Sequence, residues 1–353
     1  MHINDLLETT ILRNASDLHL KVGNYPLLRI NGELQALDDS IITNEDINEI
    51  FRQVTNEEQR RIFAEELEMD LAYQTDHLGR FRFNICMQEG TLGLACRPIK
   101  TIIPSLEELG LPDICKTLAM KHNGLVIVTG PTGCGKSTTL ASMLEYLNRN
   151  INRKIITITD PIEYLHQDDK CTISQREIGR DTHSFAQALK HAMRQDPDVI
   201  MVGEMRDLET MAAVLTAAET GHLVLTTLHT RGAPGAIDRF IDVFPPYQQQ
   251  QVRVQLSIVL EGVIYQRLVP RSDYAARVPA LEIMTATPAI KNLVREGKTY
   301  QMMNSMQTGT PYGMCTLNQS LADLFKQKVI SREQALDNSL NQEELLGLIG
   351  NHK

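Results

Sequence analysis

The sequence lacks the features that mark a zinc ribbon, a disulfide-stabilised protein or a membrane span. Its six cysteines form no C-x-x-C pair, which argues against the first two and favours reduced thiols in a cytoplasm. No apolar run approaches the roughly 20 residues that cross a bilayer. Residues 1–5 have neither the basic nor the apolar region of a signal peptide, so we expect a cytoplasmic protein. The cysteines are Cys86, Cys96, Cys115, Cys134, Cys171 and Cys315.

An excess of positive charge is missing as well. The chain has 35 Lys and Arg against 44 Asp and Glu, a net charge of −9, which argues against a broad nucleic-acid interface but leaves room for a local basic patch. Its 353 residues, 42% of them hydrophobic, are typical of a globular protein with enough chain for two domains.

One segment indicates chemistry directly, because residues 130–137 match the phosphate-loop pattern G-x-x-x-x-G-K-[ST]. Glycines allow backbone N–H groups to surround phosphate oxygens, the lysine reaches the β- and γ-phosphates, and the hydroxyl of Ser137 takes one position on Mg²⁺. A buried strand over 125–129 and a helix over 137–147 would place the phosphates at a helix N-terminus. The predicted nucleotide-binding residues are Gly130, Pro131, Thr132, Gly133, Cys134, Gly135, Lys136, Ser137 and Thr138.

The elements around this loop predict an α/β fold. Residues 1–98 read as a small α+β domain, and residues 99–110 as a proline-bracketed linker. From 111 to 353 strands alternate with helices, which predicts a parallel sheet covered on both faces. The expected strands are 125–129, 154–159, 199–203 and 223–228, followed by a long helix over 247–266 and a helical tail.

Carboxylates follow two of these strands. Glu204 comes directly after the strand 199–203, which is a usual place for a second nucleotide motif, although it could also cap the following helix. Asp160 and Glu163 follow the strand 154–159, and either could act as general base towards the γ-phosphate, or both could be solvated turn residues.

Two histidines flank the strand 223–228. His222 precedes it and His229 follows it, so roughly 23 Å separates them on an extended strand. His229 lies at the end where the site is expected and could polarise the γ-phosphate, whereas His222 could equally be structural. In the first domain, Arg80 and Arg82 share one strand face, which alone indicates a solvated surface.

Together these signatures resemble the secretion and pilus motor ATPases, and within them the type IV pilus retraction ATPases. The resemblance covers essentially the whole chain, and its motifs occur in the family's order. They are residues 16–20, an N-terminal signature; 79–82 and 97–98, segments that supply arginine fingers; 130–138, Walker A; 160–164, an Asp box; 203–207, Walker B; 221–230, a His box; and 289–296, a C-terminal element of retraction motors.

The resemblance implies a RecA-like P-loop core with a smaller PAS-like N-terminal domain, and an ATPase that works as a homohexamer with ATP and Mg²⁺. Glu163 would be the catalytic base, and Glu204 would act at Mg²⁺ and its water. The site would be completed by His222 and His229 of the His box and by the arginine fingers Arg80, Arg82 and Arg97. The motor would act at the inner face of the cytoplasmic membrane on a pilus platform protein, with a paralogous retraction ATPase as a further partner and no nucleic acid.

Three departures from the family pattern are modest. Cys134 replaces a commoner serine whose side chain need not touch phosphate, Thr159 replaces a frequent glutamate, and Lys291 replaces an arginine. The absence of paired C-x-x-C motifs and of a longer N-terminal region favours retraction over extension. The alternatives are an accessory retraction subunit, a pilus-assembly or type II secretion ATPase, and a RecA-like nucleic-acid motor.

Overall fold

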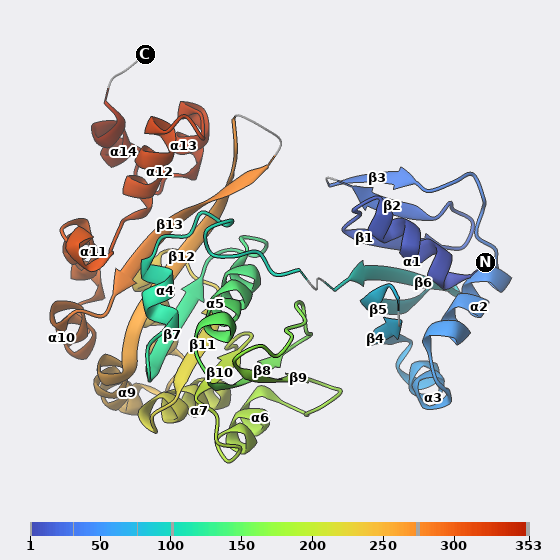
Figure 1. Cartoon of the computed structure of the whole chain (residues 1–353), viewed down its shortest axis with the longest axis horizontal. Helices are drawn as coiled ribbons and strands as arrows, with labels where there is room; N and C mark the ends of the chain where they lie inside the picture. The colour runs from blue at the N-terminus through green and yellow to red at the C-terminus, as the bar shows by residue number, and fades with distance from the viewer. Residues whose placement is uncertain (1, 31, 76, 100–101, 273–275, 351–353) are drawn as a thin grey trace. The chain divides into compact units, whose positions relative to one another are not determined.

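The structure is a computed structural model that describes residues 2–30, 32–75, 77–99, 102–272 and 276–350, so part of the expected linker lies outside the described residues. The chain divides into two compact units (Figure 1), residues 1–102 with 163–165, and residues 103–162 with 166–353.

An antiparallel sheet of six strands, in the order β3-β2-β1-β6-β5-β4, forms the centre of the first unit. Side chains next to its helices cap them. Helix α2, for example, begins with a capping box between Thr43 and Asp46. The same helix buries Ile47, Ile50 and Phe51. The bounds are α1 Ile3–Leu12, β1 Asp17–Lys21, β2 Leu27–Ile30, β3 Glu33–Ala36, α2 Asn44–Val54, α3 Glu57–Glu66, β4 Glu68–Thr75, β5 Gly79–Gln88 and β6 Thr91–Pro98.

A seven-stranded sheet in the order β13-β12-β7-β11-β10-β8-β9 organises the second unit. Six neighbouring strands are parallel, and only the edge strand β13 runs antiparallel to β12. The bounds are β7 Gly124–Thr129, β8 Lys154–Thr159, β9 Thr172–Glu177, β10 Val199–Val202, β11 Leu223–Leu228, β12 Leu260–Pro270 and β13 Arg277–Thr285.

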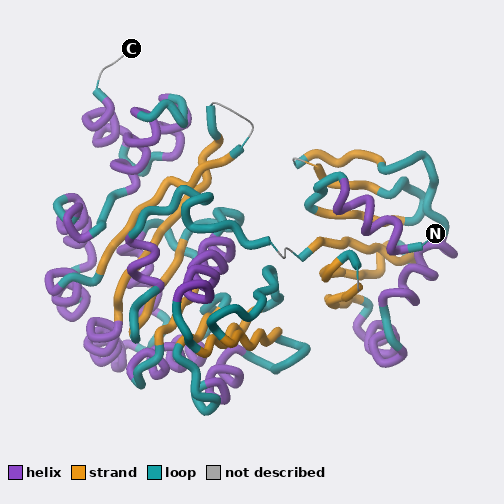
Figure 2. Tube along the Cα trace, viewed as in Figure 1, coloured by secondary structure: helices purple, strands orange, loops and turns teal. Residues whose placement is uncertain are grey.

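Helices cover both faces of this sheet (Figure 2), and each face has its own apolar core. Every residue of β7 and β11 is buried, as expected for central strands of a parallel sheet. The helices are α4 Ile114–Ala119, α5 Lys136–Asn150, α6 Phe185–Ala192, α7 Leu208–Glu219, α8 Ala233–Asp242, α9 Pro246–Val259, α10 Pro288–Glu296, α11 Met302–Gln307, α12 Leu317–Lys326, α13 Arg332–Asn338 and α14 Gln342–Ile349, with short 3₁₀ turns at Thr299–Gln301 and Thr310–Tyr312. Within the described ranges, none of the helices combines the length and apolarity needed to cross a bilayer.

The expected strands at 125–129, 154–159, 199–203 and 223–228 are confirmed, within one residue at each end, as β7, β8, β10 and β11. The prediction of one helix over 247–266 is wrong, because helix α9 ends at Val259 and strand β12 begins at Leu260. A short, mostly apolar segment such as 259–265 does not show by periodicity alone whether it is helix or strand. Tertiary pairing decides for the strand, since β12 lies between β7 and β13 and bonds to both.

Candidate active site

The phosphate loop joins β7 to α5 in a backbone conformation that requires glycine. Gly130, Gly133 and Gly135 have φ angles of +145°, +75° and +91°, a region that other residues rarely adopt. A Cβ atom on Gly130 would lie 2.3 Å from the carbonyl oxygen of Gln266, and one on Gly135 would lie 3.0 Å from its Nε2. The backbone angle and the β12 carbonyl therefore exclude a side chain at Gly130, whereas at Gly135 the backbone angle disfavours one and the Gln266 amide would have to shift.

Lys136 is the first residue of α5, and only 8% of its surface is exposed. Its Nζ donates to the carbonyl oxygens of Gly130 at 3.1 Å and Pro131 at 3.0 Å, so the ammonium is held at the loop, where phosphate oxygens could replace the carbonyls. Burial, opposed by the Lys136 charge, raises the pKa of the buried Cys134 thiol above its usual 9.0. A buried, neutral thiol fits the expectation that this side chain need not contact phosphate.

Gln266 holds the loop from the neighbouring strand, and sequence reasoning missed it. Its side chain is 2% exposed, its Nε2 donates to the carbonyl oxygen of Cys134, and its Oε1 accepts from Thr139 Oγ1 at 2.8 Å. The amide thus joins the loop to the first turn of α5. No local sequence pattern indicates this role, because it depends on the pairing of β12 with β7. The sequence analysis expected this segment to be helical.

Glu204 and His229 meet at the carboxyl-terminal edge of the sheet. They follow β10 and β11, which are parallel neighbours with Val202 opposite Thr226. His229 Nε2 lies 3.8 Å from Glu204 Oε2, and Arg206 Nη2 lies 2.6 Å from Glu204 Oε1. Burial and then the nearby Lys136 charge lower the pKa of His229 below 6.5, which outweighs the opposing effect of Glu204.

His229 also lines a cavity of about 670 Å³ together with Gly130, Pro131 and Thr132. The structure therefore brings the predicted His229 and Glu204 to the phosphate loop. His222 lies at the other end of β11, where its Nδ1 is 2.9 Å from the carbonyl oxygen of Ala217, just before the end of α7. His222 therefore contacts α7, at the end of β11 that is remote from the phosphate loop.

Asp160 and Glu163 lie in the loop between β8 and β9, and both side chains are exposed. The buried carboxylate of Glu177, at the end of β9, accepts from the Ile162 N–H at 3.2 Å and so holds the start of this loop. Glu163 is thus an exposed carboxylate, and the residue before it in the chain is held by the buried Glu177.

The three arginines belong to the first unit, where Arg80 is buried and the other two form ion pairs. Arg82 and Arg97 lie directly opposite each other on β5 and β6. Arg82 Nε is 3.3 Å from Asp70 Oδ1, and Arg97 Nη2 is 2.7 Å from Asp17 Oδ1. Two carboxylates therefore offset two like charges that face each other across the strands.

Residues 103–337, two thirds of the chain, match the family described as type II/IV secretion system protein. The chain belongs to the type II/IV secretion system protein family.

Two curated members of this family illustrate the similarity. The chain is 45% identical to the type IV pilus retraction ATPase PilT of Pseudomonas aeruginosa, over 95% of this chain and 97% of that protein. It is 41% identical to the type IV pilus ATPase PilU of the same organism, over 98% of this chain and 90% of that protein.

A solved structure of this family extends the comparison to the fold. The crystal structure of the pilus retraction motor PilT with bound ADP has a TM-score of 0.92 and 44% identity, and covers 98% of both chains. The resemblance to the retraction ATPases and the predicted α/β P-loop fold are therefore confirmed.

A second cavity lies beside the last residues of the phosphate loop. Its volume is about 520 Å³, and its lining includes Gly135, Thr138, Leu109, Leu268 and Arg277. Apolar side chains beside the end of a phosphate loop suit a nucleobase, with polar groups for the sugar. Sequence reasoning singled out no base-binding residue, because this lining comes from three distant segments.

Proposed function

We propose that this chain is an ATP-hydrolysing motor that powers type IV pilus retraction, as PilT does by its name. The observation that carries the proposal is the meeting of the phosphate loop, Glu204 and His229 at one edge of the sheet. Since a P-loop fold serves many functions, the choice of retraction rests on the nearly full-length similarity to PilT.

Nucleotide binding follows from the loop and from the two cavities beside it. Lys136 would exchange the carbonyls of Gly130 and Pro131 for β- and γ-phosphate oxygens, which form stronger charge-assisted bonds. The N-terminal amides of α5 favour the same anion. The cavity beside Leu109 and Leu268 would take the nucleoside.

Hydrolysis needs a general base, a metal ion and a side chain that hydrogen-bonds the γ-phosphate. Glu163 is the proposed base, which would take a proton from the attacking water. The hydroxyl of Ser137 and the carboxylate of Glu204 are oxygen donors of the kind that Mg²⁺ prefers, so these two residues would hold it, Glu204 directly or through water. When bound, Mg²⁺ neutralises phosphate charge. A neutral His229, in keeping with its lowered pKa, would hydrogen-bond the γ-phosphate.

Arg80, Arg82 and Arg97 would complete the site as arginine fingers in a homohexamer. Exposed ion pairs are worth only about 0–1 kcal/mol, and both side chains of the Arg82–Asp70 pair are exposed, by 39% and 54%. Arg82 can therefore exchange carboxylate for phosphate at small cost. Such an exchange would couple nucleotide occupancy to movement of the first unit.

The proposed motor would work in the cytoplasm, at the inner face of the membrane, on a pilus platform protein. An accessory role is the second candidate, because the chain is also 41% identical to PilU. Phosphate release by the purified chain distinguishes these two roles, since a main motor releases phosphate from ATP on its own and an accessory subunit does not.

The test combines chemistry with a cell phenotype. Glu163→Gln should leave ADP affinity unchanged and slow phosphate release by about 10²-fold, whereas the matched variant Asp160→Asn should have a much smaller effect. Deletion of the gene should give cells with extra surface pili and no twitching. Bald cells would instead indicate assembly, and turnover that needs DNA would indicate a nucleic-acid motor.

A further inference from the structure

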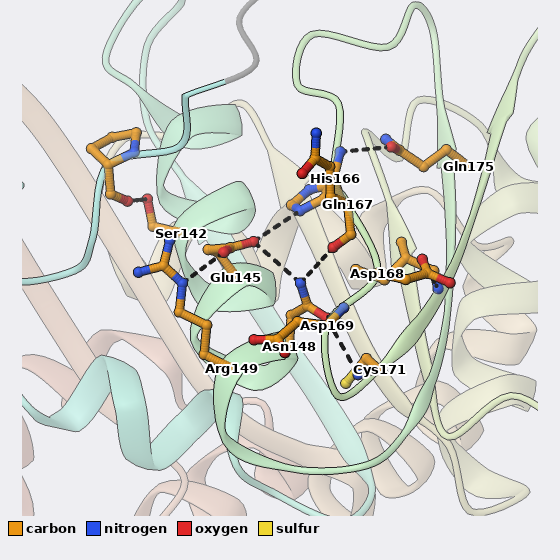
Figure 3. Close-up of polar contacts among 12 residues, drawn as sticks. Ser142, Glu145, Asn148, Arg149, His166, Gln167, Asp168, Asp169, Cys171 and Gln175 are labelled. Carbon is orange, nitrogen blue, oxygen red and sulfur yellow. Dashed lines mark hydrogen bonds and ion pairs between the residues drawn. The ribbon is translucent and has the colours of Figure 1, made fainter.

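A buried amide side chain, that of Asn148, lies near the C-terminal end of α5, and Figure 3 shows its polar contacts. Asn148 follows Lys136 by twelve residues, about 18 Å along the helix axis, and is only 1% exposed. Asn148 lies in the last turn of α5, where an asparagine side chain can compete for backbone hydrogen bonds. A buried amide at such a position needs partners outside the helix.

Those partners are backbone groups of a single loop segment, 167–171. Asn148 Nδ2 donates to the Gln167 carbonyl at 2.7 Å. Its Oδ1 accepts from the Asp169 N–H at 3.1 Å and the Cys171 N–H at 3.3 Å. The backbone carbonyl of Asn148 accepts from the Lys170 N–H at 3.0 Å. Four hydrogen bonds from one residue therefore fasten this segment to α5.

The fastened segment is the second half of the loop that carries Glu163. Strand β9 holds the first half, because Glu177 accepts from the Ile162 N–H at 3.2 Å and Gln175 Oε1 accepts from the His166 N–H at 2.8 Å. Glu163 thus lies between two anchors on β9, at Ile162 and His166, and the α5 anchor follows directly after the second. Since α5 begins at Lys136, the helix is a rigid link between the phosphate loop and this loop.

We propose that Asn148 is a positioning residue for ATP hydrolysis, which fastens the loop that carries Glu163 to α5, the helix that begins at the phosphate loop. The inference rests on the proposed function, in which Glu163 is the base. A general base must stand within hydrogen-bond reach of its proton, and a displacement of about 1 Å can cost about 10²-fold in rate. Loss of the three side-chain hydrogen bonds from Asn148 to this segment should therefore reduce kcat and leave nucleotide affinity unchanged.

A double-mutant cycle with Glu163→Gln tests this. Asn148→Ala should lower kcat about 10- to 100-fold in the wild-type chain, with the Kd for ADP within twofold. In the Glu163→Gln background the same change should lower kcat by less than threefold, because the base whose position it disturbs is already gone. Equal fold losses of kcat in both backgrounds would overturn the proposal. A loss of ADP affinity as large as the loss of kcat would overturn it as well.

The control is Asn150→Ala, two residues further along the same helix. Asn150 is exposed, and its Nδ2 donates only within the helix, to the Tyr146 carbonyl at 2.7 Å, so kcat should not change. Hydrogen exchange should show faster exchange of the Asp169 and Cys171 amides in Asn148→Ala, with the first turn of α5 unaffected; unchanged exchange there would contradict the proposed anchor.

Gln175→Ala provides a second way to loosen the loop if Asn148→Ala does not fold. It removes the acceptor of the His166 N–H and should show the same dependence on Glu163, while a loss of equal size in both backgrounds would count against the proposal. If Glu163→Gln itself leaves kcat unchanged, the assignment of the base fails and this inference fails with it. If Glu163→Gln slows hydrolysis and both anchor variants are additive with it, only this inference fails.

Discussion

Gln266 offers the sharpest test of how the phosphate loop keeps its shape. The change is Gln266→Leu, which preserves most of the side-chain volume and removes both hydrogen-bonding groups. The Cys134 carbonyl loses its donor, and the Thr139 hydroxyl loses an acceptor at 2.8 Å. Both partners belong to the loop or to the first helical turn, so the cost falls on the nucleotide site.

The expected loss of ADP affinity depends on whether each former partner of Gln266 can find another hydrogen bond. The Thr139 hydroxyl can turn back to a carbonyl of its own helix, whereas the buried carbonyl has no such choice. One orphaned buried group costs about 1–3 kcal/mol. If the loop leaves its binding conformation to relieve that cost, ADP binding must restore it, and about 1.4 kcal/mol corresponds to tenfold in Kd. We therefore expect ADP affinity to fall about 5- to 150-fold.

Calorimetric titration with ADP measures this, and thermal unfolding should show a midpoint lower by several degrees, at about 2–4 °C per kcal/mol. The control is Gln251→Leu, an exposed position on α9, which should change neither quantity. A Gln266→Leu variant that binds ADP within twofold of the wild type and keeps its unfolding midpoint would show that this amide does not hold the loop.

Three further outcomes are expected. Lys136→Ala should abolish measurable ADP binding and phosphate release, because the phosphate charge loses its main partner; titration with ADP checks this, and retained turnover would remove the phosphate-loop argument. Although burial opposes it, hydrogen bonding to Arg97 lowers the pKa of Asp17 below 3.8. The stabilisation from this carboxylate is therefore present above that pH and lost as the pH falls through the folded-state pKa. Urea unfolding should show Asp17→Asn less stable by up to about 1 kcal/mol at pH 7, and a difference that persists in strong acid would contradict this assignment. Burial outweighs the attraction of Glu145 and lowers the pKa of His166 below 6.5, so the unfolded chain binds a proton before the folded one does and stability falls as the pH drops below about 6.5. His166→Gln should flatten unfolding midpoints between pH 7 and pH 5, and an unchanged slope would assign the acid sensitivity to other groups.

Much of the fold could be predicted because its signals are local. Thr287, followed by Pro288 and ended by Gly297, predicts a helix that the structure contains as α10 with these caps. The alternation of buried strands with helices predicts a parallel sheet, and in such a sheet the carboxyl ends of neighbouring strands meet at one edge. Glu204 and His229 could therefore be assigned to one site from the order of the strands that they follow.

Other parts of the site depend on contacts between residues far apart in the chain, which local patterns do not encode. Gln266 was expected in a helix and instead lies on β12, where only the neighbouring β7 brings it to the phosphate loop. Asn148 follows the helix predicted over 137–147, and its partners appear only when a loop about twenty residues later folds against it. The sequence by itself determined the phosphate loop, its strand and helix, and the strand ends that carry Glu204 and His229, because short stretches of adjacent residues encode each of these. Which buried amides hold those groups in place was decided by tertiary structure alone, since a buried polar side chain takes its partners from whatever the fold packs against it.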